Sequence, residues 1–315
     1  MKYLFINIIS RGAKSNTYKF ALAKFLLDYS KSQKLKEQDY QISYTEIAIK
    51  FLEYYWFQEC KYKFKQDFNK DKMPKIIRII QKYCGTEYIS ESFEKYFKGK
   101  EKIKLHMIEE IERECFNDVI PRFQPKDKND YYQHFHKSLK SGNYSSSKKS
   151  YIILSKEALF CFKQEYEVLS KILVLEWAKF LEKTNFTPKL ISKIERMKDP
   201  KRNSLIKFKT MLIEMNQECF YCGTILEQSN IHIDHFIPWS YIYEDEIWNL
   251  VPSCSRCNLI KSDSLPPKKC LIKIENRNKI YQLIKWNSSI TDYYENCYKA
   301  GFKIINEERL NCDNF

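Results

Sequence analysis

The chain has 315 residues, of which 54 are Lys or Arg and 40 are Asp or Glu, so its formal net charge is +14. Its many Tyr and Phe residues and its 6 Gly are typical of a globular protein, which excludes a disordered or fibrous chain. The length allows two domains, or one large core with a small module attached. A basic surface of this size favours a polyanionic partner, because neutralising phosphates releases condensed counterions. A general enrichment in Lys is the alternative explanation for the charge.

The sequence lacks the features that mark membrane and secreted proteins. Its first ten residues are apolar, but they have neither the basic region nor the small-residue cleavage site of a signal peptide. No apolar run approaches the roughly 20 residues of a membrane helix. Of the 11 cysteines, four form two C-x2-C pairs, and the others are scattered without the regular spacing of a disulfide framework, which fits a reducing compartment. We therefore expect a soluble, cytoplasmic protein without a membrane partner.

The N-terminal part of the chain predicts a bundle or array of helices. Thr17, or the Asn before it, is suited to cap a helix in which apolar residues recur at helical spacing. Ser43 and Glu46 have the spacing of a capping box before a second helix. Pro74 is suited to open a third helix, since proline lacks only a donor that would be unpaired there. The aromatic stripes of these helices are typical of a buried core.

Two short extended runs, 119–123 and 151–155, predict a β-hairpin in the region 119–155. After it, one long helix is predicted over 156–185, because apolar residues keep a helical period throughout. The polar stretch inside the hairpin mixes basic and aromatic residues, which suits phosphate contacts and base stacking on a nucleic-acid strand. A solvated surface loop is the alternative. The residues concerned are Lys137, Lys140, Lys148, Lys149, Tyr131, Tyr132, Phe135 and Tyr144.

Four cysteines form two C-x2-C pairs, Cys219 with Cys222 and Cys254 with Cys257, which are separated by 31 residues. Each pair places two sulfurs at one turn, and two pairs supply the four thiolates of a tetrahedral zinc site. Such a site has no open coordination position, so we expect a structural Zn²⁺ rather than a catalytic one. The residues between the pairs must then fold as a unit that zinc holds at both ends.

The residues between and after the pairs predict a compact ββα unit. Residues 231–236 alternate apolar and polar side chains, as a half-buried strand does. A second strand is predicted over 247–252 and carries Asn249, and a helix is predicted over 255–262. We expect a mainly α protein with a small ββα-metal, zinc-stapled module. The protein as a whole then belongs to the α+β class. The predicted domains are a helical domain for recognition or partner binding at 1–200, the zinc-stapled module at 201–270 and a helical tail that packs on the rest at 271–315.

Three side chains of this unit have the chemistry of a metal-dependent hydrolase. Asp234 offers a carboxylate oxygen and Asn258 an amide oxygen, and both suit Mg²⁺, which keeps several waters and accepts phosphate oxygens. His235 is a neighbouring imidazole that can accept a proton near neutral pH. The segment therefore predicts a second metal site, distinct from the cysteines, where a water is activated.

The run D-H-F-I-P, the later Asn249 and the run C-S-R-C-N-L-I-K together resemble the HNH endonuclease family, of the zinc-knuckle kind with the ββα-metal fold. By that resemblance, His235 is the general base that activates water for attack on a phosphodiester. Asn249 holds the loop between the strands and orients the base. Asn258 stands at the third signature position, in place of His, and binds the catalytic Mg²⁺ or Mn²⁺ together with Asp234.

Three further residues are candidates for nucleic-acid contacts. His232 lies where nucleases of the resembled family sometimes have another carboxylate or His, and we expect a supporting role for it. Arg256 and Lys261 are predicted to contact backbone phosphates, or else to be ordinary exposed residues of the helix.

The segments N-T-Y-K-F-A-L, V-I-P-R-F and W-A-K-F-L-E-K-T-N-F-T-P also resemble bacterial HNH proteins with a helical N-terminal region, which are proposed to act in restriction or anti-phage defence. We therefore predict an endonuclease that hydrolyses phosphodiester bonds in DNA. An RNA- or tRNA-directed nuclease toxin and a zinc-stapled nucleic-acid-binding module that does not cut are the alternatives. Expected partners are DNA, a partner subunit such as a defence-system ATPase or sensor, and a second copy of the chain.

Overall fold

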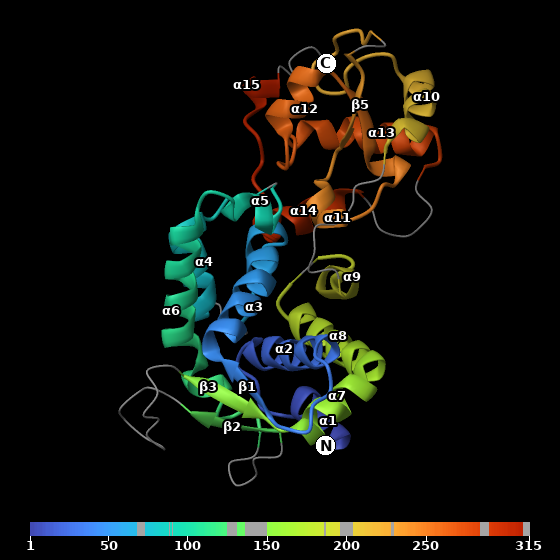
Figure 1. Ribbon diagram of the computed structural model, residues 1–315. Coiled ribbons are helices and arrows are strands. Elements are labelled where there is room, and N and C mark those ends of the chain that lie inside the picture. Colours follow the sequence, from blue (N-terminus) through green and yellow to red (C-terminus); the bar gives the residue numbers. More distant parts are fainter. Residues whose placement is uncertain are drawn as a thin grey trace. The chain divides into compact units, whose positions relative to one another are not determined.

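The computed structural model divides the chain into two compact units (Figure 1). Unit 1 contains Met1–Thr184 and Leu190–Asp199, and unit 2 contains Asn185–Lys189 and Pro200–Phe315. Helices dominate and the sheets are small, which confirms the prediction of a mainly α, α+β protein. Among the described residues, no helix is both long enough and apolar enough to cross a bilayer. The structure describes residues 1–67, 73–87, 89, 91–124, 131–135, 150–185, 187–195, 204–227, 230–283 and 290–310.

Unit 1 packs its helices around a core rich in aromatic side chains. Trp56 and Trp177 are fully buried, and Phe20 stacks on Trp177 with ring centroids 5.8 Å apart. The predicted aromatic stripes are therefore core. The helices are α1 (Lys2–Ser10), α2 (Tyr18–Ser32), α3 (Tyr44–Trp56), the π-helical turn η1 (Phe57–Lys61), α4 (Lys75–Cys84), α5 (Phe93–Phe97), α6 (Glu101–Val119), α7 (Lys156–Gln164), α8 (Tyr166–Glu182) and α9 (Leu190–Glu195).

The helices α2 and α3 begin where the sequence predicts, but Thr17 does not cap α2 with its side chain. Ser43 and Glu46 form the capping box of α3: the Ser43 hydroxyl accepts from the Glu46 N–H, and the Glu46 carboxylate accepts from the Ser43 N–H. Thr17 precedes α2, but its hydroxyl does not cap the helix. It is buried and bonds instead to the Tyr55 hydroxyl and to Gln66. Thr17 therefore ties α2 to the core.

The small sheet of unit 1 has three antiparallel strands in the order β1–β3–β2. Two sequence predictions are wrong here. Residues 119–123 form no strand, because α6 continues through Val119 and a turn follows it. The single helix predicted over 156–185 is two helices that break at Glu165. The strands are β1 (Tyr40–Ser43), β2 (Tyr132–Phe135) and β3 (Tyr151–Leu154).

The stretch predicted to stack on nucleic-acid bases is in part core. Tyr131 and Tyr132 are fully buried, and Tyr132 donates to the carbonyl oxygen of Ile120 at 2.7 Å. Phe135 stacks on Tyr151 across the sheet, with ring centroids 4.8 Å apart. These three aromatic side chains therefore pack within the fold. The other predicted contacts, Lys137, Lys140, Tyr144, Lys148 and Lys149, lie outside the described residues.

A buried tyrosine fixes the starts of two helices of unit 1 against α6. Tyr18 is the first residue of α2, and its hydroxyl accepts the N–H of Ile76 in the first turn of α4 at 2.9 Å. The same hydroxyl donates to the Cys115 sulfur on α6 at 3.7 Å. Burial raises the pKa of Tyr18 well above its ordinary value, so this phenol stays protonated.

Unit 2 is built around an antiparallel pair, β4 (His232–His235) and β5 (Leu250–Ser253). His235 pairs with Leu250, and His232 pairs with Ser253. The helix predicted over 255–262 is present as α12 (Ser255–Lys261), which follows β5 directly. The other helices of the unit are α10 (Ile206–Met215), α11 (Trp239–Ile242), the 3₁₀ turn η3 (Ile247–Asn249), α13 (Lys269–Ile280), α14 (Ile290–Lys299) and α15 (Glu307–Leu310).

The last three helices belong to the same core as the two strands. Ile274 of α13, Tyr294 of α14 and Leu310 of α15 are fully buried in the cluster that contains Cys219 and Phe236. The Tyr294 hydroxyl also donates to the carbonyl oxygen of Pro266 at 2.6 Å. The residues after the zinc knuckles therefore complete the hydrophobic core of this unit.

Candidate active site and zinc centre

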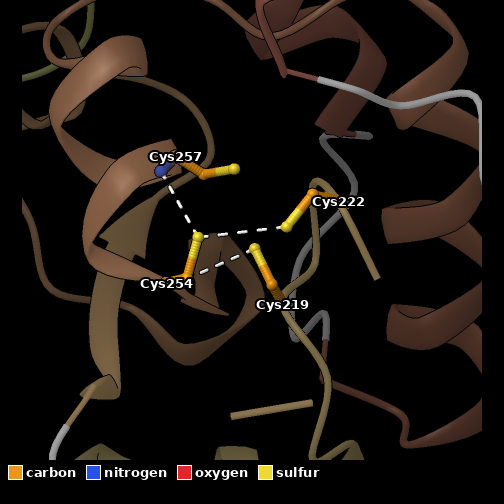
Figure 2. Close-up of side chains that lie close together, drawn as sticks. All are labelled: Cys219, Cys222, Cys254 and Cys257. Atoms are coloured by element: carbon orange, nitrogen blue, oxygen red, sulfur yellow. Dashed lines mark hydrogen bonds between the residues drawn. The ribbon is translucent and has the colours of Figure 1, made fainter. Parts of the chain in front are cut away.

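The four cysteines of the two C-x2-C pairs converge at one point (Figure 2). Their sulfurs all lie within 4.8 Å of one another, and those of Cys222 and Cys254 are 3.9 Å apart. Four sulfurs around a tetrahedral zinc with bonds of about 2.3 Å are separated by about 3.8 Å, so the cluster can hold a zinc ion. Cys254 caps α12 and Cys257 lies in its first turn, while Cys219 and Cys222 lie in a turn before β4.

Backbone amides are directed at the sulfurs. The N–H of Cys254 donates to the Cys219 sulfur and the N–H of Cys257 donates to the Cys254 sulfur, both at 3.4 Å. Hydrogen bonds from the Cys257 thiol and from backbone N–H groups lower the pKa of Cys219 to about 4. Such donors stabilise negative charge on sulfur, which is the form that binds zinc. The local backbone is therefore arranged for thiolates.

Asn249 closes the loop that joins the two strands. Its amide nitrogen donates to the carbonyl oxygen of Ile237 at 2.9 Å, and its amide oxygen accepts the N–H of Ile237 at 2.8 Å. Its own carbonyl oxygen accepts the N–H of Phe236 at 2.8 Å. Asn249 is fully buried, and it lies in η3 just before β5 rather than inside the strand as predicted. It fixes the backbone immediately after His235.

Asp234 is held by two side chains that were not expected to contact it. Its Oδ2 atom accepts from the Tyr221 hydroxyl at 2.6 Å and lies 3.0 Å from the Lys261 Nζ. Lys261 also donates to the carbonyl oxygen of His235 at 2.7 Å, and it is fully buried. Lys261 is therefore a structural cation that fixes the Asp234–His235 pair. The prediction that it is an exposed helix residue or a phosphate contact is wrong, because its ammonium has no access to solvent.

His235 is buried, and its ring contacts a carboxylate that the sequence did not single out. Its Nε2 atom lies 3.0 Å from Asp245 Oδ1. Burial lowers the pKa of His235, while the charge of Asp234 and the hydrogen bond with Asp245 partly offset this effect. The imidazole is therefore neutral at pH 7. If Nε2–H donates to Asp245, Nδ1 keeps a lone pair and can accept a proton.

The remaining candidates differ in their access to the site. Asn258 is half-buried on α12, one turn before Lys261 and on the same face. Within the described part of the chain, its side-chain amide makes no hydrogen bond. His232 lies on the same face of β4 as Asp234, but it is exposed, as is Arg256 on α12. The structure gives no contact that ties His232 or Arg256 to His235.

The oxygen donors at this site suit a hard divalent cation. Asp234 Oδ2 is engaged, whereas its other carboxylate oxygen has no partner among the residues that the structure describes. The amide oxygen of Asn258 is likewise unengaged within that part of the chain. Mg²⁺ and Mn²⁺ use few protein oxygens and take water or phosphate as further ligands, so these two residues fit such an ion.

Asp245 contacts His235 and Tyr221 contacts Asp234, but neither was singled out from the sequence. Asp245 is the middle of three consecutive acidic residues, a pattern that ordinarily marks a solvated loop. Tyr221 lies inside the first C-x2-C pair, where the metal ligands dominate any interpretation. Their positions beside His235 and Asp234 come from the folding of the loops.

Comparison with known proteins gives two matches that we report. Residues 219–267 match the model of the HNH endonuclease family. Protein ea31 of Escherichia phage lambda is 28% identical over 108 residues, which is 30% of this chain and 36% of that protein, so the match spans about a third of that protein's length. No solved structure matches the chain. The zinc-knuckle segment of this chain, residues 219–267, belongs to the HNH endonuclease family.

Proposed function

We propose that this protein is a metal-dependent endonuclease that hydrolyses phosphodiester bonds in DNA. The observation that supports the proposal most directly is the buried pair of His235 and Asp245, with Nε2 and Oδ1 3.0 Å apart. Burial keeps the imidazole neutral, and a hydrogen bond from Nε2–H to Asp245 leaves Nδ1 as the basic atom. Asp234, the residue before His235 in β4, supplies the carboxylate for the metal. A neutral base beside a divalent-metal site is the arrangement that metal-dependent phosphodiester hydrolysis requires.

In the proposed reaction, His235 Nδ1 accepts a proton from a water as the water oxygen attacks phosphorus. The bond from phosphorus to the 3′ oxygen breaks, and the leaving oxygen takes up a proton from solvent. The products carry a 5′-phosphate and a 3′-hydroxyl. A Mg²⁺ or Mn²⁺ bound by Asp234 and Asn258 would offset negative charge on the phosphate and on the leaving oxygen. Asn249 and Lys261 hold the backbone around His235 so that the base stays in place.

DNA is the proposed substrate because the chain carries a net charge of +14 and contains an HNH endonuclease segment. The proposed setting is bacterial restriction or anti-phage defence, in the cytoplasm, on the basis of the sequence resemblance. There the protein would act with a partner subunit such as an ATPase or sensor. Each site makes one cut, so a double-strand break requires two copies or two visits, and we propose a homodimer for this purpose.

The test is a cleavage panel with plasmid DNA, single-stranded RNA and tRNA, each with Mg²⁺, Mn²⁺ or no added metal. We expect nicked or linear plasmid with either metal, and a loss of at least about 100-fold for His235→Ala, because general-base catalysis typically contributes that much. His106→Ala is the control, since His106 is an exposed histidine on α6. Cleavage that survives His235→Ala contradicts the assignment of the base. Cleavage of RNA or tRNA without DNA contradicts the substrate.

A further inference from the structure

Unit 1 contains an open groove of about 1210 Å³ that the proposed nuclease chemistry does not use. Three segments supply most of its lining: the residues around the start of α2, those around the start of α4 and the C-terminal end of α6 with the turn after it, and Asp67 adds to them. The hydrogen bonds of Tyr18 to Ile76 and Cys115 hold these segments together, so the groove is a fixed feature of the fold. The charged residues that line it are the cations Lys14, Lys19, Lys75, Arg78 and Arg122 and the carboxylates Asp67, Glu114 and Asp118.

The three carboxylates offset these five cations only in part. Glu114 pairs with Arg113 at 3.2 Å, and Arg113 is not among the residues that line the groove. Asp118 pairs with Arg122 at 3.2 Å, within α6 and the turn after it. Among the described residues, Lys19 and Arg78 have no carboxylate within 4 Å. The groove therefore has an excess of positive charge.

The positions of the lysines are unfavourable in the free protein. Burial and then the charge of Lys19 lower the pKa of Lys14, and burial and then the charge of Arg122 lower the pKa of Lys19. Lys19 and Lys75 also lie in the first turns of α2 and α4, where the helix dipole disfavours a cation, and neither first turn contains an acidic residue. Mutual repulsion is relieved when an anion binds between such cations.

We propose that this groove binds the phosphate backbone of double-stranded DNA, as a contact surface additional to the metal site of unit 2. The volume exceeds the roughly 300–1000 Å³ of a typical small-molecule pocket, and the cations come from three separate segments of the chain. An extended polymer of phosphates suits that arrangement better than a single phosphate group. The inference rests on the proposed function, and it adds a substrate contact that the HNH segment does not contain.

The test measures binding of a fluorescent DNA duplex to full-length His235→Ala protein, which holds the substrate without cutting it. The groove variant is Lys19→Gln with Arg78→Gln. The control is Lys102→Gln with Lys171→Gln, which removes the same charge from exposed lysines outside the groove. Each phosphate contact contributes about 0.9 to the slope of log K against log salt, so we expect the groove variant to lower that slope by up to about 1.8. Affinity at about 0.1 M salt should fall roughly 10-fold or more, with little change in the control.

Thermal unfolding separates binding from structure. Removing repelling cations should leave the Tm of the groove variant equal to or above that of the parent protein, whereas a structural role for Lys19 or Arg78 predicts a lower Tm. Unchanged affinity and salt slope in the groove variant overturn the proposal, as does a loss of affinity for RNA without a loss for DNA. Because binding and cleavage are measured separately, wild-type protein that binds DNA through the groove but never cuts it contradicts the nuclease and leaves the groove supported.

Discussion

The imidazole of His235 is oriented by a neighbouring carboxylate. Asp245 Oδ1 lies 3.0 Å from Nε2, and both side chains are about nine-tenths buried, so water competes little for this hydrogen bond. A hydrogen bond of this kind selects the tautomer as well as the ring orientation, as the buried Asp does in a serine-protease triad. At the residue scale, the proposed chemistry therefore depends on Asp245 as a positioning residue.

We expect Asp245→Asn to lower kcat at least about 10-fold while DNA affinity stays unchanged, because an amide that donates to Nε2 moves the proton to Nδ1. The Asp245 carboxylate raises the pKa of His235, so its removal lowers that pKa further. The acidic limb of the pH–rate profile should accordingly move to lower pH. Glu246→Gln, an exposed neighbour in the same loop, is the control. A reduced rate with an unmoved profile would indicate a purely structural role.

Residues of the candidate site could be recognised in the sequence where the chemistry of the site requires a particular kind of side chain. The convergence of the four cysteines was predicted from their spacing and is confirmed. Asp234, His235 and Asn258 were predicted from their donor chemistry and from the resemblance to the family. Lys261 was misjudged because lysine is almost always exposed, and its burial depends on two acceptors, the Asp234 carboxylate and the His235 carbonyl oxygen. Contacts that close across separate loops have no signature in the local sequence.

At the scale of elements, the two cysteine pairs connect the start of α12 to the turn before β4. The site can hold zinc, and metal binding to such a cluster contributes directly to the folding of the unit. Because Asn258 and Lys261 lie on α12, the zinc cluster also determines where these residues stand relative to β4. One helix therefore connects the cysteine cluster with the proposed catalytic residues.

We expect one zinc per chain by elemental analysis of the purified protein. Cys257→Ser should lose most of that zinc and lower the Tm, because three thiolates leave the tetrahedron incomplete. Cys161→Ser is the matched control, since Cys161 is half-buried on α7 in unit 1 and is not one of the four clustered cysteines. Stoichiometric zinc in Cys257→Ser would contradict the four-cysteine site.

Elements with strong local signals were predicted, and those decided by tertiary contacts were not. The capping box of α3 and the apolar stripe of α2 are local, and both helices are present. The strand β1 was missed because its four residues pair with β3, more than a hundred residues later. The break at Glu165 escaped prediction because hydrophobic periodicity continues across it and no proline or glycine marks it.

At the scale of the molecule, each unit has its own core, and that of unit 2 extends far beyond the family segment. Phe236, the residue after His235, contacts Tyr294 of α14 with ring centroids 6.3 Å apart. Tyr294 is fully buried and its hydroxyl bonds to Pro266. Phe236, next to the proposed base, thus packs against α14, a helix that lies outside residues 219–267.

We expect Tyr294→Ala to destabilise unit 2 by about 3–5 kcal/mol, the usual cost of deleting a large buried aromatic ring. Tyr294→Phe keeps the ring and removes a single hydrogen bond, so its cost should be about 1 kcal/mol. Urea unfolding, followed by the fluorescence of the tryptophans, measures both. Equal, small effects of the two variants would show that the α14 packing does not support the core.

The family segment and the basic charge were accessible from the sequence, whereas the groove of unit 1 and the extent of the core of unit 2 were not. The groove of unit 1 brings together cations from residues 14 to 122, and no local pattern connects them. The same holds for the core of unit 2, where Cys219 and Leu310 meet in one cluster. Long-range packing decides both, and a single sequence does not display it.

This shared core has a consequence for synthesis on the ribosome. The HNH segment ends at residue 267, but its core is closed by side chains up to Leu310. Unit 1 has all but a short piece of its residues before position 185, and domains generally fold as units in the order in which they emerge. During translation, the groove of unit 1 is therefore complete while the core around the HNH segment is still unfinished, so on our two proposals the nascent chain gains the capacity to bind DNA before it gains the capacity to cut it.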